Sequence, residues 1–272
     1  MSRYCFIIPR TPEKYDNAFR KALWKICRQS LINQRETSWT ALIIGKRDSG
    51  ERDERFVYLE EDLLPKADKI RLGLDYALKM QGPPPYVIRL DDDDVISETV
   101  LAAHAEKNFD CLYDARHTFY EICSARISMQ KRNWYPNTIV HKIEHAAYKI
   151  PWKEKKEYLL CTDHSATWHT YYSGKHCIST DGNEPLYMRI LSPFSITSRA
   201  AITEKAFVSS YISYLSGFGA WSVNRKSIKG LDNSLDMLLE IGKARELYGL
   251  PQVRWPLWKL FIGRLRAYKE GW

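Results

Sequence analysis

The sequence has no apolar run close to the roughly 18–20 residues of a membrane-spanning helix, so we do not expect it to cross a bilayer. Its first apolar run, Cys5–Ile8, is too short for the core of a signal peptide. The six cysteines contain no CxxC pair, and without an export signal we expect reduced thiols in the cytoplasm. With only 13 glycines and 12 prolines in 272 residues, the composition excludes a collagen-like or disordered chain.

Positive charge is in excess, but only in the second half of the chain. The formal net charge is +8, from 41 Lys and Arg against 33 Asp and Glu. Residues 1–130 carry a net charge of −1, whereas residues 131–272 carry +9. An excess confined to one half indicates an anionic partner there, which can be a membrane surface, a phosphorylated acceptor or nucleic acid.

Strand and helix signals alternate over the first 110 residues, which predicts an α/β fold with a mostly parallel sheet covered by helices on both faces. Short apolar runs that end at Pro, Gly or Asp predict strands, and apolar residues at three- and four-residue spacing predict helices. The predicted strands are 4–8, 39–44, 56–59 and 86–90, with helices after the first strand and from Pro65. Further strands are predicted at 111–113, 118–127 and 186–191, and helices at 201–215 and 231–248.

Polar residues follow three of these strands. Pro9–Thr11 follow the first, Asp48 follows the second, and Asp91–Asp94 follow the fourth. Ligands of parallel sheets bind at the carboxyl ends of the strands, so the three loops are expected to converge on one crevice.

Four adjacent aspartates at a strand end need neutralisation, because two unit charges ~4 Å apart repel by about 4 kcal/mol at an effective dielectric constant of about 20. In extended backbone, Asp91 and Asp93 point to one side, and Asp92 and Asp94 point to the other. Each pair can hold Mg²⁺ or Mn²⁺ through oxygen atoms, and the cation would bind a diphosphate. The alternative is a solvated acidic turn.

Five blocks of residues, in order and spacing, carry a resemblance to a known family. They are Ser30–Gln34, Trp39–Ile44, Arg47–Gly50, Lys66–Leu74 and Leu90–Asp94. Together they resemble the SLxNQ helix, the following strand, the DDGS turn, the KxxARNxGL helix and the LDADD form of the DXD motif in GT-A nucleotide-sugar glycosyltransferases of the large family-two type. Arg10 and Pro185–Ile190 are similar to the bacterial rhamnosyltransferase branch of that family.

The resemblance implies a nucleotide-sugar donor and a site for it. Pro9, Arg10 and Thr11 would line the nucleotide pocket. Asp48 would contact the base or the ribose, and Arg71 would lie near the donor phosphates.

The resemblance also implies a metal site at the DXD motif. Asp91 would contact the ribose side of the nucleotide, with Asp92 also among the donor-binding residues, and Asp93 would ligate Mn²⁺ or Mg²⁺. A histidine from the second half, His164 or His169, would complete the metal site; core packing among aromatic residues is the alternative for both. Negative charge gathers on a departing nucleoside diphosphate, and a metal and nearby cations stabilise it.

An inverting transferase needs a carboxylate that deprotonates the acceptor hydroxyl. The candidates in the second half are Asp181, which we favour, Asp163 and Glu184. For each of them a turn-forming or surface role is the alternative, since Asp-Gly and Asp-His loops are common turns.

Two rival functions stay open. His141, Glu144 and His145 form the HxxEH pattern of a class of zinc peptidases, which requires both histidines on one helix. The basic half could instead bind nucleic acid, although it contains no recognised nucleic-acid-binding motif.

We therefore expect a metal-dependent glycosyltransferase that acts on a glycan or lipid-linked glycan acceptor in bacterial surface polysaccharide synthesis, and not on nucleic acid. The expected fold is a GT-A three-layer sandwich over residues 1–250, with a nucleotide-sugar-binding half (1–110) and an acceptor-binding half (111–250). Residues 251–272 form a basic, aromatic C-terminal tail with a net charge of +4, expected to extend the domain as a helix. Such a tail suits peripheral contact with an anionic membrane, so the expected location is the cytoplasm, with the inner membrane face as an alternative.

Overall fold

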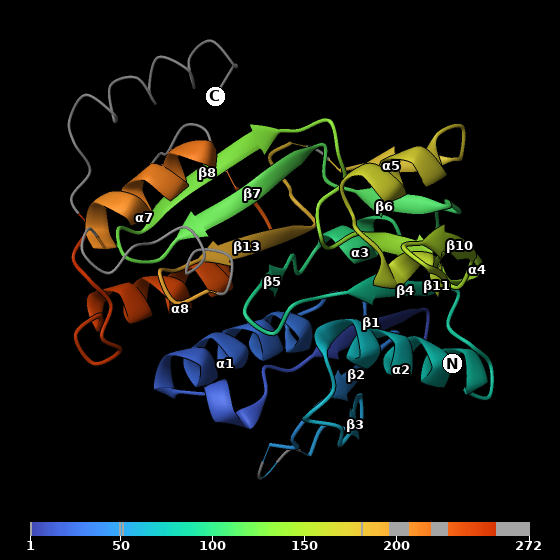
Figure 1. Cartoon of the computed structure of the whole chain (residues 1–272), viewed down its shortest axis with the longest axis horizontal. Helices are drawn as coiled ribbons and strands as arrows, with labels where there is room; N and C mark the ends of the chain where they lie inside the picture. The colour runs from blue at the N-terminus through green and yellow to red at the C-terminus, as the bar shows by residue number, and fades with distance from the viewer. Residues whose placement is uncertain are drawn as a thin grey trace.

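A computed structural model describes residues 2–48, 50, 52–180, 182–195, 207–218 and 228–253, with side chains of 207–210 not described. It is a mixed α/β structure with a large, mostly parallel central sheet (Figure 1). This confirms the predicted fold class. None of the helices in the described part of the chain is long and apolar enough to span a membrane.

The central sheet has seven strands in the order β12-β6-β9-β4-β1-β2-β3. Its first four strands along the chain run parallel to one another, and only β9 runs against its neighbours β4 and β6. The strands are β1 (Tyr4–Pro9), β2 (Trp39–Ile44), β3 (Phe56–Leu59), β4 (Tyr86–Arg89), β6 (Cys111–Tyr113), β9 (Val140–Lys142) and β12 (Cys177–Ser179).

A second sheet has four strands in the order β5-β13-β7-β8, and it lies with α7 and α8 beside the central sheet (Figure 1). Its strands are β5 (Val95–Ile96), β7 (Arg116–Glu121), β8 (Arg126–Lys131) and β13 (Tyr187–Leu191). β10 (Lys149–Trp152) and β11 (Lys155–Tyr158) form a separate hairpin.

Helices cover both faces of the central sheet, as the strand–helix alternation predicts. The helices are α1 (Ala18–Ile32), α2 (Lys66–Lys79), α3 (Val100–Ala103), α4 (Ile143–Ala146), α5 (Ala166–Tyr172), α7 (Phe207–Leu215) and α8 (Asp232–Lys243), with short 3-10 turns at Glu13–Tyr15, Leu159–Cys161 and Ser216–Phe218.

The long helix α1 is buried on two sides. Trp24, Cys27 and Leu31 pack on the central sheet, whereas Phe19 and Leu23 pack on the second sheet and α8. Because α1 packs on two sheets, its apolar stripe is wide for a surface helix. Helix α1 thus joins the two sheets through one continuous packed layer.

On the opposite face, α2 packs closely on β1 and β2 because it has a glycine at the contact. A Cβ atom at Gly73 would lie 2.7 Å from Ile7 Cγ2 and 3.0 Å from Ile44 Cδ1. No larger residue fits there without displacing the helix, so Gly73 sets the distance between α2 and the sheet.

One predicted strand is wrong in extent. Residues 118–127 were expected to form a single strand, but they contain a hairpin in which β7 and β8 pair antiparallel. The Glu121 carboxylate accepts hydrogen bonds from the backbone N–H groups of Cys123 and Ser124, at 2.9 and 2.8 Å, and Ala125 has φ of 52°. A side chain thus stabilises the turn inside an apolar segment, where strand propensity alone predicts continuation.

Two other predicted helices are shorter than predicted or are described only in part. α8 ends at Lys243, before the predicted end at residue 248. Of the predicted helix at 201–215, residues 207–215 form α7 and the rest lies outside the described residues, as does the tail beyond residue 253.

Candidate donor and metal site

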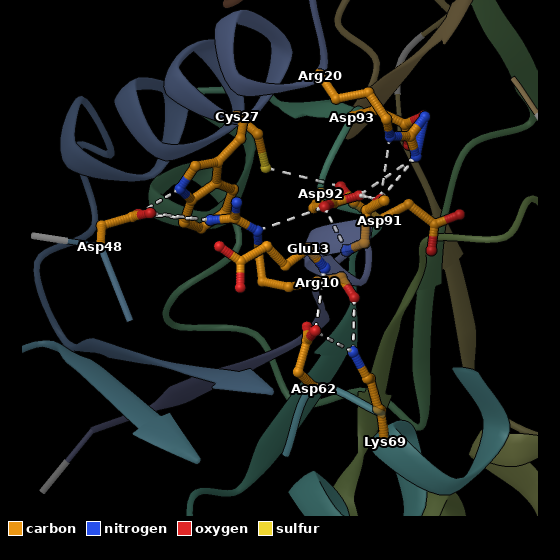
Figure 2. Close-up of polar contacts among 12 residues, drawn as sticks. Arg10, Glu13, Arg20, Cys27, Asp48, Asp62, Lys69, Asp91, Asp92 and Asp93 are labelled. Atoms are coloured by element: carbon orange, nitrogen blue, oxygen red, sulfur yellow. Dashed lines mark hydrogen bonds and ion pairs between the residues drawn. The ribbon is translucent and has the colours of Figure 1, made fainter. Parts of the chain in front are cut away.

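The carboxyl ends of β1, β2 and β4 meet in one place, as predicted. Arg10, directly after β1, lies between Asp48 and Asp92 (Figure 2). Its Nη1 is 3.4 Å from both carboxylate oxygens of Asp48, and its Nε is 3.4 Å from Asp92 Oδ2. Thr11 binds Asp92 through its backbone N–H at 2.7 Å and through its hydroxyl group at 3.1 Å.

This close approach depends on Gly45, the residue after β2. Gly45 has φ of +147°, and a Cβ atom there would lie 2.6 Å from Arg10 Cβ. A side chain at position 45 would therefore push the Arg10 loop away from the β2 end.

Asp48 lies at the far end of this network and is held by three side chains. Trp24 Nε1 and the Tyr58 hydroxyl group, the latter at 3.2 Å, donate to Oδ2, in addition to the Arg10 contact. The Arg10 guanidinium also stacks on the Trp24 ring, with its central carbon 4.2 Å from the ring centroid. The Asp48 carboxylate thus already accepts hydrogen bonds from three side chains, so a bound nucleobase would have to share it with these donors.

The four aspartates form a turn and not an extended segment. The backbone N–H of Asp94 donates to the carbonyl of Asp91 at 3.1 Å. This turn corrects the predicted alternation: Asp94 joins Asp91 and Asp93, while Asp92 alone turns towards Arg10 and Thr11. Asp91, Asp93 and Asp94 each offer an oxygen atom within 4.8 Å of the others.

Basic side chains from two helices partly neutralise this group. Lys66, the first residue of α2, donates to Asp91 Oδ2 at 2.7 Å. Arg20 of α1 donates to Asp93 Oδ2 at 3.1 Å and to the Thr11 hydroxyl group. The sequence interpretation missed Lys66 and Arg20. Lys66 begins one of the family-like blocks and could have been found, whereas no local pattern marks Arg20.

Two buried cations complete the surroundings of the site. Lys69 is 1% exposed and donates to the carbonyl oxygen of Arg10 at 2.8 Å, which holds the loop after β1. Arg89, also buried, donates to the carbonyl of Leu160 at 3.1 Å and to Asn137.

The carboxyl groups titrate very differently. Burial acts to raise the pKa of Asp91, but Lys66 and Arg89 outweigh it and hold that pKa at about 2. Burial raises the pKa of Asp93 to about 6 against the effect of Arg20, and Asp92 and Asp91 raise it further. Burial and the neighbouring carboxylates Asp93 and Asp91 raise the pKa of Asp94 well above its usual range. Asp91 is thus compensated by cations, whereas Asp93 and Asp94 hold a proton more tightly than a free aspartate does.

The donor set fits a hard divalent cation. Asp91 Oδ1 is buried and has no hydrogen-bond partner among the described residues. An all-oxygen group with a buried oxygen that lacks a donor, and with raised carboxyl pKa values, suits Mg²⁺ or Mn²⁺ better than a solvated turn.

A cleft of about 580 Å³ opens beside the site, bounded by α1 and the loop between β2 and β3. Trp24 lines it together with one face of α1. Its charged lining residues are six basic ones, Arg10, Lys21, Lys25, Arg28, Lys46 and Arg47, and three acidic ones, Glu13, Asp16 and Asp48. The excess of positive charge suits an anionic ligand.

Seven of the predicted donor-site residues therefore lie at this strand edge, and their roles stay predictions. They are Pro9, Arg10, Thr11, Asp48, Asp91, Asp92 and Asp93. Arg71 has other partners: its guanidinium binds Glu157 of β11 and Asp68. Those contacts tie α2 to the β10–β11 hairpin, so Lys66 and not Arg71 is the α2 cation in contact with the aspartates.

Among the described residues, none of the predicted second-half residues belongs to the Asp91, Asp93 and Asp94 group. His164 Nδ1 contacts the carbonyl of Tyr135 at 2.8 Å, and His164 does not belong to the Asp91 group. Asp163 accepts hydrogen bonds from Ser165 and from the backbone N–H of Ala166 at the start of α5. Burial acts to raise the pKa of Asp163, but these hydrogen bonds lower it below its usual range, which suits a capping residue better than a base. Asp181 lies outside the described residues.

The two other acidic or basic candidates have structural partners. Glu184 accepts a hydrogen bond from Thr99. His169 packs near Tyr135, with ring centroids 6.0 Å apart.

The zinc-peptidase pattern does not form the geometry it requires. His141 is on strand β9, fully buried, with Nδ1 2.7 Å from the Tyr172 hydroxyl group, whereas Glu144 and His145 are on α4. Because the two histidines are not on one helix, they cannot present the ligand pair of an HxxEH site. The peptidase hypothesis is therefore wrong for this geometry.

No protein-family model matches the chain, and no curated protein does. Among solved structures, the chain is similar to S. aureus TarS residues 1–349, at 13% identity and a TM-score of 0.43, over 100% of this chain and 92% of that one. It is also similar to the catalytic domain of Drosophila beta1,4galactosyltransferase 7 (10% identity, TM-score 0.42, 71% of this chain and 73% of that one). A third is the Streptococcus pneumoniae glycosyltransferase GlyE (8% identity, TM-score 0.38, 80% and 64%).

Proposed function

We propose that this chain is a metal-dependent glycosyltransferase of the GT-A type, which moves a sugar from a nucleoside-diphosphate sugar to an acceptor hydroxyl group. One observation carries the proposal: Asp91, Asp93 and Asp94 form a cation-deficient oxygen group at the carboxyl end of β4, beside a basic cleft of about 580 Å³. A site for a divalent cation next to a site for an anion is the arrangement that a nucleoside diphosphate requires.

Bound Mn²⁺ or Mg²⁺, held by Asp91, Asp93 and Asp94, would stabilise the charge on the departing nucleoside diphosphate. Lys66 and Arg20 lie at the rim of the same group and would add positive charge there. Trp24 and Arg10 provide a flat surface in the cleft for a nucleobase, with Asp48 as a hydrogen-bond acceptor beside it.

The finer points of the proposal concern the acceptor, the donor sugar, the location and the catalytic base. We propose a glycan or lipid-linked glycan of a bacterial surface polysaccharide, and a rhamnosyl or related hexosyl donor from the likeness of Arg10 and Pro185–Ile190. We propose a cytoplasmic location, and the net charge of +4 on residues 251–272 supports contact with the anionic inner membrane face as an alternative. Asp181 stays the proposed base, ahead of Asp163.

Calorimetry with UDP, GDP and dTDP, each with and without Mn²⁺, tests the function. We expect at least one nucleotide to bind only when Mn²⁺ is present. If none binds under either condition, the proposed function is wrong. If metal-dependent binding persists in Asp93→Ala, the function stands but the metal assignment is wrong.

A further inference from the structure

A second, smaller cavity lies against the second sheet. Its volume is about 60 Å³, and its lining comes from β7, β13, the segment after β8 and the segment before α5. The residues that decide its chemistry are His117, Phe119, Arg132, Trp134, His164 and Arg189.

The cavity is next to the proposed metal site. Arg189 of β13 lines it, and the following residue, Ile190, donates its backbone N–H to Asp94 Oδ1 at 2.9 Å. On the opposite wall, Asn137 accepts a hydrogen bond from Arg89, two residues before Asp91. A group held in the cavity would therefore lie close to the atoms that the metal organises.

The cavity wall is positively charged. Two arginines line it, and no carboxylate does among the described residues. The two histidines add no charge at neutral pH, because burial lowers the pKa of His117 to about 4 and also lowers that of His164. Arg132 forms no ion pair with a described carboxylate: Nη2 donates to the carbonyl of Gly217 at 3.2 Å, and the buried Nε has no hydrogen-bond partner. Burial lowers the pKa of Arg132, and the nearby Arg189 lowers it further. Burial acts to lower the pKa of Arg189 as well, but Asp94 and Asp91 outweigh it, so Arg189 lies between the aspartates and Arg132 in its electrostatic interactions.

Aromatic rings hold the Arg132 guanidinium in place. Its central carbon lies 4.8 Å from the Trp134 ring centroid, 5.6 Å from that of Phe119 and 5.7 Å from that of Phe218. Stacking of this kind fixes the fork of nitrogen atoms without using its hydrogen-bond donors, which stay available for an oxyanion. The same rings offer apolar surface to the face of a sugar.

The size of the cavity limits what can enter it. About 60 Å³ corresponds to the space of about four or five water molecules. A carboxylate or phosphate group fits, whereas a whole monosaccharide does not and would lie across the opening.

We propose that this cavity binds an anionic substituent of the acceptor sugar, a carboxylate or a phosphate group, through Arg132 and Arg189. The proposal rests on the proposed glycosyltransferase function, since it names the class of acceptor that reaches the same metal site.

The test compares three probes by calorimetry or ligand-observed NMR in the presence of Mn²⁺ and the nucleotide: glucose 6-phosphate, glucuronic acid and neutral glucose. We expect at least one anionic sugar to bind roughly tenfold or more tightly than glucose, because a charged hydrogen bond contributes more than a neutral one. Preference for glucose 6-phosphate indicates a phosphorylated acceptor, and preference for glucuronic acid indicates an acidic sugar. Equal binding of all three, or none, overturns the proposal.

Variants locate the binding. Arg132→Gln should reduce affinity for the anionic probe roughly tenfold and leave affinity for Mn²⁺-nucleotide within about twofold. Arg132→Lys keeps the charge and should retain part of the binding, and Lys131→Gln on the exposed neighbouring position is the matched control. Nucleotide binding also reports that each variant is folded.

The two proposals fail separately. If the nucleotide binds but no anionic sugar does, or if Arg132→Gln binds the anionic probe like the wild type, the cavity assignment is wrong and the donor site stands. If the anionic probe binds through Arg132 but no nucleotide binds, the cavity is an anion site in a protein of another function.

Discussion

Two groups of three potential metal ligands occur in the described part of this chain, and they differ in what surrounds them. Asp91, Asp93 and Asp94 lie at the end of β4, and Asp110, Glu144 and His145 lie near α4; in both groups the ligand atoms are within 4.8 Å of one another. Proximity alone therefore does not distinguish them.

The difference lies in burial and in partners. Glu144 is 61% exposed and pairs with Lys142, and His145 contacts Asp110 at 3.0 Å and the Tyr171 hydroxyl group at 2.9 Å. Glu144 is thus largely open to water, whereas the buried His145 Nε2 lies near Asp110 without forming a hydrogen bond. In the β4 group Asp94 is buried and Asp91 and Asp93 are partly buried, and Asp91 Oδ1 is buried without a hydrogen-bond donor. Burial, followed by the neighbouring carboxylates, raises the pKa values of Asp93 and Asp94, whereas Lys66 and Arg89 hold that of Asp91 at about 2. Desolvated charge without compensation, and not the spacing of ligands, marks a cation site.

The largest effect that separates the two groups is expected from ligand removal. Asp91→Asn and Asp93→Asn should each weaken Mn²⁺-dependent nucleotide binding on the order of 100-fold, because each removes an anionic oxygen from the group. Calorimetry measures this, with Asp110→Asn as the matched control, expected to bind like the wild type. If Asp110→Asn weakened Mn²⁺-dependent nucleotide binding as much as Asp91→Asn and Asp93→Asn do, the two groups would not differ as cation sites.

The second expected effect is on stability in the absence of metal. The folded-state pKa of Asp93 is about 6, above the ordinary value of 3.8, so the folded protein binds the proton more tightly than the unfolded chain. Stability therefore falls as pH rises between about 4 and 6, and the full loss is present above pH 6. Asp93→Asn should remove the loss and raise the free energy of unfolding at pH 8 by about 3 kcal/mol.

Urea unfolding of the metal-free protein at pH 5 and pH 8 measures this change. Asp110 provides the opposite case: burial acts to raise its pKa, but hydrogen bonds from His145 and the His176 backbone N–H lower it. Asp110→Asn should not stabilise the protein at pH 8. A destabilised Asp93→Asn would show that the carboxylate is well compensated without metal.

The third expected effect is a pH dependence of metal binding. Protons compete with the cation for Asp93, whose pKa is about 6, and for Asp94, whose pKa is also raised. Affinity for Mn²⁺ should fall at least tenfold for each pH unit below 6. Mn²⁺ titration followed by electron paramagnetic resonance measures this. An affinity that stays constant down to pH 5 would contradict the assigned ligands.

The smallest effect is expected at α4. Glu144→Gln should change nucleotide binding less than about twofold, and the purified protein should contain no stoichiometric zinc, because His141 and His145 are on different elements. Elemental analysis and calorimetry measure the two outcomes. Stoichiometric zinc that disappears in Glu144→Gln would revive a metal function for that group.

Local patterns predicted the elements around the donor site well, because the spacing of apolar residues in these elements is regular. Tyr4–Pro9, Trp39–Ile44 and Phe56–Leu59 are short apolar runs with clear ends, and each forms the strand expected. The hairpin at residues 116–131 was missed because a buried carboxylate, Glu121, stabilises its turn, and no pattern of apolar residues reveals such a bond.

Side-chain partners were the weakest part of the prediction. Arg20 is 73 residues from Asp93 along the chain, and it reaches Asp93 only because α1 packs beside the carboxyl end of β4. Arg71 was placed near phosphates, but the β10–β11 hairpin brings Glu157 to it first. Contacts of this kind depend on how helices and strands pack together, and the residues next to each position in the sequence do not reveal that packing.

The sequence by itself determined the α/β class, the parallel strand ends and the presence of an aspartate run after β4, since these follow from periodicity and from the chain order of strands. Only the tertiary structure decided that Asp94 and not Asp92 joins Asp91 and Asp93, and that Arg189, which lines a second cavity, is next to the residue that binds Asp94. A turn changes side-chain direction within one residue, and long-range packing chooses which charges meet, so the electrostatics of the site exist only in the folded chain.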